Sequence, residues 1–164
     1  YGRLKVEAEK VVQNSRLNWA IVRPILLYGW PYPGGRDNLV VSWVRSLTEK
    51  KPIKVVNNVF SKPLPASSCA EVVWAIIQQS AEGVFHAAGQ NHVSLYQLAL
   101  LVADVFGLDA SLITPVPDSY FPEIAPRPKD TSFDTTKMKT VLRVEPIDIR
   151  TGLERLKMER SNGV

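Results

Sequence analysis

The first five residues of the chain, YGRLK, place a tyrosine and a lysine four positions apart at the start of a stretch that predicts a helix. Residues at this spacing share one face of a helix, so the phenol of Tyr1 and the ammonium of Lys5 would lie side by side. A positive charge beside a tyrosine lowers the pKa of the phenol, because it stabilises the phenolate. The pair is therefore a candidate for acid–base chemistry near neutral pH, and an exposed helical pair is the alternative.

Metal and disulfide chemistry have little support in this sequence. Cys69 is the only cysteine, and His86 and His92 are the only histidines, so no spacing matches a zinc site or a disulfide. We expect no metal site, and we expect Cys69 to be a small core residue. The net charge of +4 is mild and forms no basic stripe interleaved with aromatic residues, which argues against nucleic-acid binding but is compatible with an anionic small substrate.

The composition is that of a globular protein with one core, since 45% of the 164 residues are hydrophobic. The sequence contains no apolar run long enough for a membrane-spanning helix, no signal peptide and no lipidation motif. We therefore expect a cytoplasmic protein without a membrane partner.

The elements that would position the Tyr1 and Lys5 pair alternate between helices and strands. A helix is expected from the start of the chain to about Asn14, and the apolar segment LNWAIVRPILLYG predicts a strand buried on both faces of a parallel sheet. The proline- and glycine-rich segment GWPYPGGRD predicts a loop. A helix over 39–47 and a short strand over 53–56 follow.

Two helices in the middle of the chain have the spacing of a capping box. Ser68 stands three residues before Glu71, and Ser94 three residues before Gln97. The second of these helices should end at Gly107. A buried strand is predicted over 83–89, between the two helices, and a short strand near 112–114 after them.

The last part of the chain begins with a proline-rich loop over 118–133. Asp134 is expected to cap a helix through Leu142, and an amphipathic helix should run from Ile147 to about Arg160. Because helices and strands alternate throughout, the sequence predicts the α/β class. A dinucleotide-binding fold also needs a glycine-rich turn after its first strand, and none of the nine glycines is arranged in that way.

Several segments resemble, in the same order along the chain, the extended short-chain dehydrogenase/reductases, and within them the dTDP-4-dehydrorhamnose reductase branch and related sugar-nucleotide epimerases. YGRLKVEAE is similar to the catalytic YxxxK helix of that family, and WAIVRPILLYG to the strand that follows it. The segments VVNNVFSKPLPASSCAEVVWAI, GVFHAAGQNHVSLYQLALLVADVFG and APRPKDTSFDTTKMKTVL resemble parts of the substrate-binding region. The resemblance covers nearly the whole chain.

This resemblance implies the C-terminal part of a Rossmann-type fold with a small substrate-binding α/β region. Residues 1–52 would belong to the NAD(P)-binding Rossmann domain, and residues 53–164 mainly to the substrate-binding region, with about 67–90 returning to the Rossmann sheet. In the resembling proteins the tyrosine lies about halfway along, so the chain corresponds to the C-terminal half of a longer enzyme. The glycine-rich turn and the catalytic Ser or Thr of the family would precede Tyr1.

The resemblance also implies an activity, the transfer of a hydride from NADP or NAD to a keto group on a nucleotide-linked sugar. Tyr1 would be the proton donor, while Lys5 would lower its pKa and bind the nicotinamide ribose. In the family, the positions of Pro24, Ile25 and Leu26 pass beside the nicotinamide, so backbone contact with the cofactor is one expectation for them and the packing of a buried strand is the other. The chain alone is expected to be inactive.

Two arginines differ in what the sequence implies for them. Arg127 lies in the Arg-Pro loop that the family uses near the sugar nucleotide, and a guanidinium there suits bidentate phosphate contact. A surface ion pair is the alternative for Arg127. Arg23 lies inside an apolar strand, where we expect a structural ion pair.

Some positions depart from the pattern of the rhamnose branch and leave the sugar open. Hydroxyl and aromatic residues are usual in place of residues 24–26, an acidic pair in place of Asn57 and Asn58, and an aspartate in place of Ser68. Two alternatives to the reductase therefore stay open. One is an epimerase or dehydratase of the same superfamily, and the other is a regulatory subunit that keeps the fold and binds a partner enzyme. Whether the protein forms a homodimer also stays open.

Overall fold

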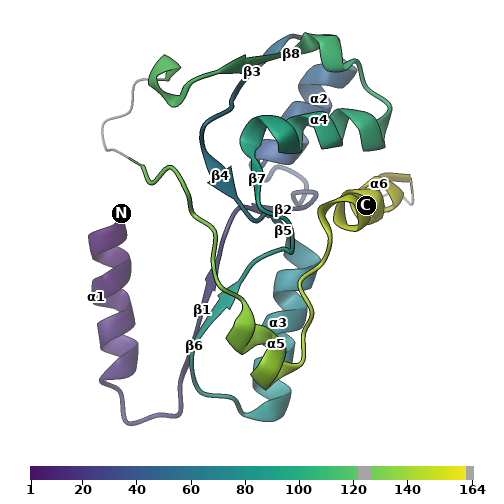
Figure 1. The fold of residues 1–164 in the computed structure, drawn as a ribbon. Coiled ribbons are helices and arrows are strands. Elements are labelled where there is room, and N and C mark those ends of the chain that lie inside the picture. Colours follow the sequence, from purple (N-terminus) through teal and green to yellow (C-terminus); the bar gives the residue numbers. More distant parts are fainter. Residues whose placement is uncertain (122–126, 162–164) are drawn as a thin grey trace.

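Helices and strands alternate along the chain in the computed structural model, which describes residues 1–121 and 127–161. The predicted α/β class is therefore confirmed. Figure 1 shows that α1 (Gly2–Gln13) stands to one side of the molecule, next to the strands that follow it. Part of the proline-rich loop, residues 122–126, lies outside the described residues.

The other helices are α2 (Leu39–Thr48), α3 (Ala66–Gln79), α4 (Leu95–Phe106), α5 (Thr136–Leu142) and α6 (Ile149–Ser161). The strands are β1 (Ala20–Pro24), β2 (Leu27–Tyr28), β3 (Ile53–Val56), β4 (Phe60–Ser61), β5 (Leu64–Pro65), β6 (Gly83–Ala87), β7 (Val93–Ser94) and β8 (Ile113–Val116). Two short 3-10 helices, η1 (Ala110–Leu112) and η2 (Asp118–Tyr120), flank β8. None of the helices in the described part of the chain combines the length and the apolar character that crossing a membrane requires.

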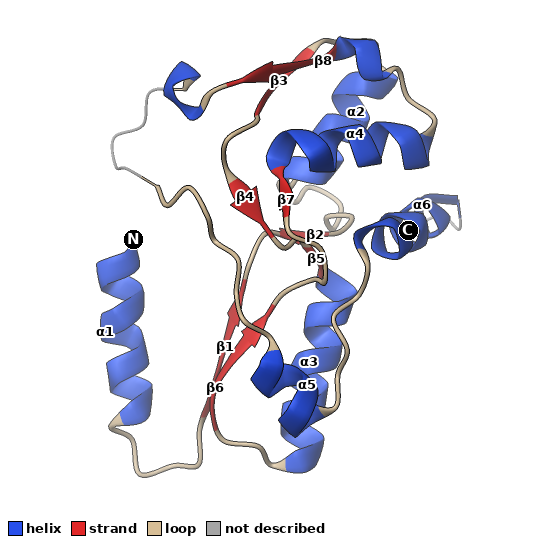
Figure 2. Ribbon diagram, viewed as in Figure 1, coloured by secondary structure: helices blue, strands red, loops and turns tan. Residues whose placement is uncertain are grey.

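The strands form four pairs, and segments far apart in sequence meet in each of them (Figure 2). Three pairs are parallel: β1 with β6, β2 with β5, and β3 with β8. The pair of β4 and β7 is antiparallel. In the longest pair, Ala20 is opposite Gly83 and Pro24 is opposite Ala87, so β1 and β6 end at the same edge.

Two hydrophobic clusters form the core. The first joins α2, α4, α6 and β3 through side chains such as Trp43, Leu98 and Leu153. The second packs α3 and α5 against one face of the β1–β6 pair, with Phe85 fully buried at its centre. Tyr28 of β2 belongs to the first cluster, and a Cβ at Gly152 of α6 would lie 2.3 Å from its phenol oxygen. A glycine inside this helix therefore allows its close approach to β2.

The expected strand over LNWAIVRPILLYG differs from the structure in two ways. It is interrupted after Pro24, because Leu26 has a left-handed backbone with φ of 42°, and β2 begins after this bend. β1 is also half-buried rather than buried on both faces. Its exposed face is turned toward α1, and no residue of α1 is buried.

One of the two predicted capping boxes is confirmed. The Ser94 hydroxyl accepts from the Gln97 N–H at 3.1 Å, and the Gln97 side chain accepts from the Ser94 N–H at 2.8 Å. This helix, α4, ends at Gly107, whose φ of 68° is left-handed as predicted. The predicted box at Ser68 is wrong, because α3 begins directly after Pro65, so Ser68 lies within its first turn, where the Ser68 side chain is buried.

The last predicted helices are present with shifted starts. The cap position of α5 is Thr135, although the Asp134 carboxylate accepts from the Thr136 N–H at 2.6 Å as a capping side chain would. The final helix, α6, starts at Ile149, two residues later than expected. The Asp148 carboxylate accepts from the Thr151 N–H at its start, at 3.1 Å.

Lys137 of α5 covers the outer edge of β6. Its ammonium donates to the carbonyl oxygens of Val84 at 3.0 Å and Glu82 at 3.4 Å, and lies 4.0 Å from the centre of the Phe85 ring. The β6 carbonyls at this edge have no neighbouring strand among the described residues. The lysine thus satisfies groups that an edge strand would otherwise present to another chain.

Candidate functional site

Tyr1 and Lys5 lie together at the start of α1. The Lys5 N–H donates to the Tyr1 carbonyl at 3.1 Å, which closes the first helical turn, and the Lys5 ammonium lies 5.4 Å from the centre of the Tyr1 ring. The Tyr1 side chain is 94% exposed, so its hydroxyl is accessible from outside the chain. The structure therefore brings this pair together as the helical spacing predicts.

An ion pair between Glu9 and Arg23 connects α1 to β1. Glu9 is one turn beyond Lys5 on the same face of the helix, and its carboxylate accepts from the Arg23 Nε at 2.7 Å and also from Nη2. The structural ion pair expected for Arg23 is confirmed. The hydrogen bond from Arg23 lowers the pKa of Glu9, and that to Glu9 raises the pKa of Arg23.

The segment Pro24, Ile25 and Leu26 lies at the end of β1 between two other strands. The Ile25 N–H donates to the Ala87 carbonyl at 3.2 Å, and the Leu26 carbonyl accepts from the Leu64 N–H at 3.2 Å. Figure 1 shows that β1 runs in the direction of the end of α1 where the chain begins, so this segment and the start of α1 lie toward the same end of the β1–β6 pair.

Arg127 lies on a separate segment, in the loop that follows η2. Its side chain is exposed, and Asp130 follows three positions later in the sequence. Asp118, just before this loop, binds Lys129 within it. The Asp118 carboxylate accepts from the Lys129 ammonium at 2.6 Å and from the Asn58 side-chain amide at 3.0 Å. Both hydrogen bonds lower the pKa of Asp118, and the one from Lys129 has the larger effect.

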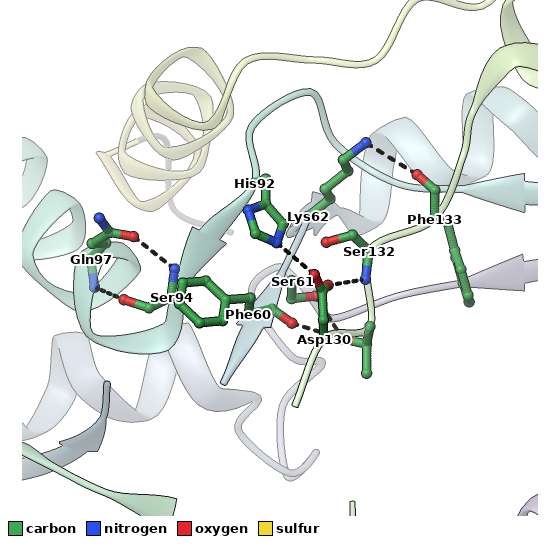
Figure 3. Close-up of polar contacts among 10 residues, drawn as sticks. Phe60, Ser61, Lys62, His92, Ser94, Gln97, Asp130, Ser132 and Phe133 are labelled. Carbon is green, nitrogen blue, oxygen red and sulfur yellow. Dashed lines mark hydrogen bonds and ion pairs between the residues drawn. The ribbon is translucent and has the colours of Figure 1, made fainter. Parts of the chain in front are cut away.

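A second polar group next to this loop was not predicted from the sequence. The His92 Nε2 lies 2.9 Å from the Asp130 Oδ2, and the imidazole stacks on the Phe60 ring with 5.2 Å between ring centres (Figure 3). The Ser132 N–H donates to Asp130 Oδ1 at 2.8 Å. Hydrogen bonding from Ser132 contributes most to lowering the pKa of Asp130 to about 2, and the contact with His92 lowers it further. Only the Asp-x-Ser spacing gave a local signal for part of this group.

An open hollow of about 540 Å³ lies beside the exposed face of β1 and β6, lined in part by Arg23, His86 and Lys137. Each of these side chains already has a partner within the chain. Arg23 binds Glu9, Lys137 binds the β6 edge, and the His86 ring stacks on Phe133 at 4.4 Å.

Among residues 1–121 and 127–161, no three His, Cys, Asp or Glu side chains gather as a metal site would require. Cys69 is buried, as expected, and burial raises the pKa of its thiol.

The Tyr–Lys helix, the parallel β1–β6 pair and the smaller α/β region around β3 and β8 together form the C-terminal part of a Rossmann-type fold with a substrate-binding region. A model described as the RmlD substrate binding domain matches residues 1–161, and the chain belongs to this family. The family and the fold class expected from the sequence are thus confirmed.

Named relatives include an enzyme subunit and a reductase. The beta subunit of methionine adenosyltransferase 2 from Mus musculus is 28% identical over 160 residues, which cover 94% of this chain and 47% of that protein. dTDP-4-dehydrorhamnose reductase from Escherichia coli (strain K12) is 25% identical over 166 residues, which cover 95% of this chain and 54% of that protein. The chain therefore spans about half the length of the curated relatives it matches.

A solved structure with the same fold is dTDP-4-dehydrorhamnose reductase from Bacillus anthracis str. Ames in complex with NADP. Its TM-score is 0.88 at 24% identity, and the match covers 97% of this chain and 55% of that one. At this identity the likeness defines the fold, and the chemistry has to be argued from the residues of this chain.

Proposed function

We propose that this chain is the C-terminal portion of an NAD(P)-dependent sugar-nucleotide reductase, most like dTDP-4-dehydrorhamnose reductase. The observation that carries the proposal is the Lys5 ammonium 5.4 Å from the centre of the Tyr1 ring, at the exposed start of α1. The chain also belongs to the RmlD substrate binding domain family and matches a dTDP-4-dehydrorhamnose reductase over 95% of its length.

The two parts of the chain have separate tasks in this proposal. Residues 1–52 form the end of the NAD(P)-binding Rossmann domain, residues 53–164 mainly form the substrate-binding region, and about 67–90 return to the Rossmann sheet. The parallel pairing of β1 with β6 supports this division. The glycine-rich turn that the dinucleotide requires would come from a Rossmann half outside these residues, so the chain alone would not turn over substrate.

Tyr1 and Lys5 are suited to a nicotinamide nucleotide, because both are exposed polar side chains at the start of α1. In this proposal the backbone of residues 24–26 passes beside the nicotinamide. When bound, NADP or NAD in its reduced form supplies the hydride. Tyr1 donates a proton to the oxygen of the sugar ketone as the alcohol forms, and the Lys5 ammonium stabilises the resulting phenolate. Lys5 also donates to the ribose hydroxyls, and Arg127 binds the diphosphate of the sugar nucleotide.

Replacing the proton donor tests the proposal. In the complete protein, Tyr1→Phe keeps the ring and removes the hydroxyl, and we expect kcat with NADPH and a dTDP-linked 4-keto sugar to fall about a hundredfold, which is a typical contribution of general acid catalysis. Tyr32→Phe is a matched control, because Tyr32 is also exposed, at 90%, on the loop before α2. Near-normal turnover in Tyr1→Phe would exclude Tyr1 as the donor.

The similarity to the methionine adenosyltransferase 2 beta subunit favours a second candidate function, that of a subunit that binds another enzyme. The same assay separates the two candidates. A reductase consumes NADPH in proportion to the keto sugar supplied, whereas a binding subunit shows no consumption above background and co-elutes with its enzyme in size-exclusion chromatography.

A further inference from the structure

We propose that His92 and Asp130 form a clamp that positions Arg127 for contact with the substrate diphosphate, an inference that rests on the function proposed above for Arg127. The clamp is defined as the His92–Asp130 contact together with Phe60, on which His92 stacks. In this proposal the clamp residues do not touch the substrate, and they act through the backbone of residues 127–130.

The segment 129–131 lies along β4 and pairs with it through one parallel bridge, in which Asp130 is opposite Phe60. The Phe60 N–H donates to the Lys129 carbonyl at 2.7 Å, and the Thr131 N–H donates to the Phe60 carbonyl at 3.1 Å. On its other side, β4 pairs with β7, where Phe60 is opposite Ser94. Three segments from distant parts of the chain therefore lie side by side, with β4 in the middle.

His92 connects the two outer segments of this group (Figure 3). It directly precedes β7, its ring lies on the Phe60 ring of the middle strand, and its Nε2 reaches the Asp130 Oδ2 at 2.9 Å. The second Asp130 oxygen accepts from the Ser132 N–H at 2.8 Å. The carboxylate is thus held from both sides, and segment 129–131 is fastened by side chains as well as by its backbone.

Little freedom is left between the clamp and Arg127. Pro128 has a fixed φ, and a residue that precedes a proline is restricted to extended conformations, so the backbone of Arg127 is restricted as well. Lys129 is held by its backbone to Phe60 and by its ammonium to Asp118, at 2.6 Å. Three residues span at most about 10 Å, so a displacement of Asp130 should move the backbone from which the Arg127 side chain extends.

A purely stabilising role fits the clamp less well. The side chains of His92 and Asp130 are 46% and 54% exposed, and neither residue belongs to the two core clusters. An exposed pair of this kind contributes little to the global stability of a protein. Its removal should therefore loosen the segment locally and leave the fold intact.

Amide hydrogen exchange tests the clamp without any ligand. We expect His92→Ala and Asp130→Ala each to speed the exchange of the Phe60 and Thr131 amides about fivefold, as removal of an exposed charged pair allows, and the double variant to exchange no faster than either. Asp130→Asn should stay close to wild type, because the amide oxygen still accepts from the Ser132 N–H and the amide nitrogen can donate to Nε2 of a neutral His92. Asp109→Ala is the matched control, since Asp109 accepts from the Ser111 N–H at 2.9 Å in the same kind of turn elsewhere.

Kinetics of the complete protein with NADPH and a dTDP-linked 4-keto sugar test the positioning of Arg127. We expect the two alanine variants to raise KM about fivefold with kcat unchanged, and Asp130→Asn to restore KM. Unchanged exchange in both alanine variants would overturn the clamp, and faster exchange with an unchanged KM would overturn its positioning role. A wild-type protein without turnover would instead contradict the proposed function, and the exchange result would then decide on the clamp by itself.

Discussion

Arg23 and Arg127 show how differently two arginines of one chain can be placed. Arg23 is half-buried on β1 and is held by the Glu9 carboxylate, so its charge is used within the fold. Arg127 is exposed on a loop, two residues before Lys129, whose ammonium is bound by the Asp118 carboxylate. The second arrangement suits contact with an anionic ligand.

We predict that Arg127→Ala acts on binding more than on chemistry. In the complete protein it should raise KM for the sugar nucleotide about tenfold, because a charge-assisted hydrogen bond to a diphosphate is lost, while kcat changes less than twofold. Arg36→Ala, on the exposed loop before α2, is the control for the loss of a surface charge. If KM is the same in both variants, Arg127 has a surface role instead.

At this scale, the sequence allowed the prediction of contacts within one helix and little beyond. The meeting of Tyr1 and Lys5 follows from a spacing of four residues, which the helix converts into proximity. The need of Arg23 for an anionic partner could be predicted from its apolar surroundings. The contact between His92 and Asp130 could not, because it joins residues 38 positions apart and depends on how β4 lies between them.

Among the elements, α1 depends most on a polar contact, because no residue of α1 is buried. Arg23 lowers the pKa of Glu9 in the folded chain from the ordinary value of 4.5. A carboxylate with a lowered folded-state pKa stabilises the folded arrangement fully above the unfolded value, and this contribution is lost as pH falls through the folded value.

We therefore predict that α1 loosens from β1 as pH falls below about 4.5, the unfolded value. Amide exchange of residues in α1, corrected for the intrinsic pH dependence, should become faster relative to that of α4 over this range. Glu9→Gln should show the loosened behaviour already at pH 7 and no further change on acidification. Parallel pH profiles in wild type and Glu9→Gln would show that another contact holds the helix.

A second prediction for an element concerns the start of α4, where Ser94 and Gln97 cap each other. Ser94→Ala should lower the free energy of unfolding by about 1 kcal/mol, because the Gln97 N–H loses its acceptor. Urea denaturation measures this, with Ser42→Ala in the exposed part of α2 as a control that should change stability little. An equal, small effect of both substitutions would contradict a stabilising cap.

Most helices could be predicted because their apolar spacing and their ends are local properties. The box at Ser94 and the stop at Gly107 are both present, since nothing outside α4 competes with them. Ser68 has the same spacing, yet its helix starts earlier, because Pro65 ends β5 and leads directly into α3. The bend at Leu26 also escaped prediction, since a left-handed leucine has no sequence signal.

For the whole molecule, we predict that the 164-residue chain alone binds NADPH no better than millimolar. Binding of the pyrophosphate relies on a glycine-rich turn at a helix N-terminus, and none of the nine glycines forms one with its neighbours in sequence. Isothermal titration calorimetry of the purified chain measures this, with the complete protein as the positive control. Saturable micromolar binding to the chain would show that the dinucleotide site does not depend on a glycine-rich turn.

The order of motifs along the chain was sufficient to predict the family and the α/β class, because both depend on local patterns repeated in the same sequence order. The spatial grouping was not predictable in the same way. β3 pairs with β8, which is about sixty residues further along the chain. The two core clusters each combine helices with strands, but the helices differ between them. Such pairing depends on the packing of all elements at once.

Because Lys137 covers the outer edge of β6, a further strand can join the β1–β6 sheet on one side only. Trp19 and Ile25 use their backbone groups to pair with β6, so by alternation Ala20 and Val22 direct theirs to the opposite side, where the described residues place no strand. A further strand, from the same protein or from a second copy, can therefore enter only beside β1. A single lysine on a seven-residue helix thus decides on which side this sheet can be extended.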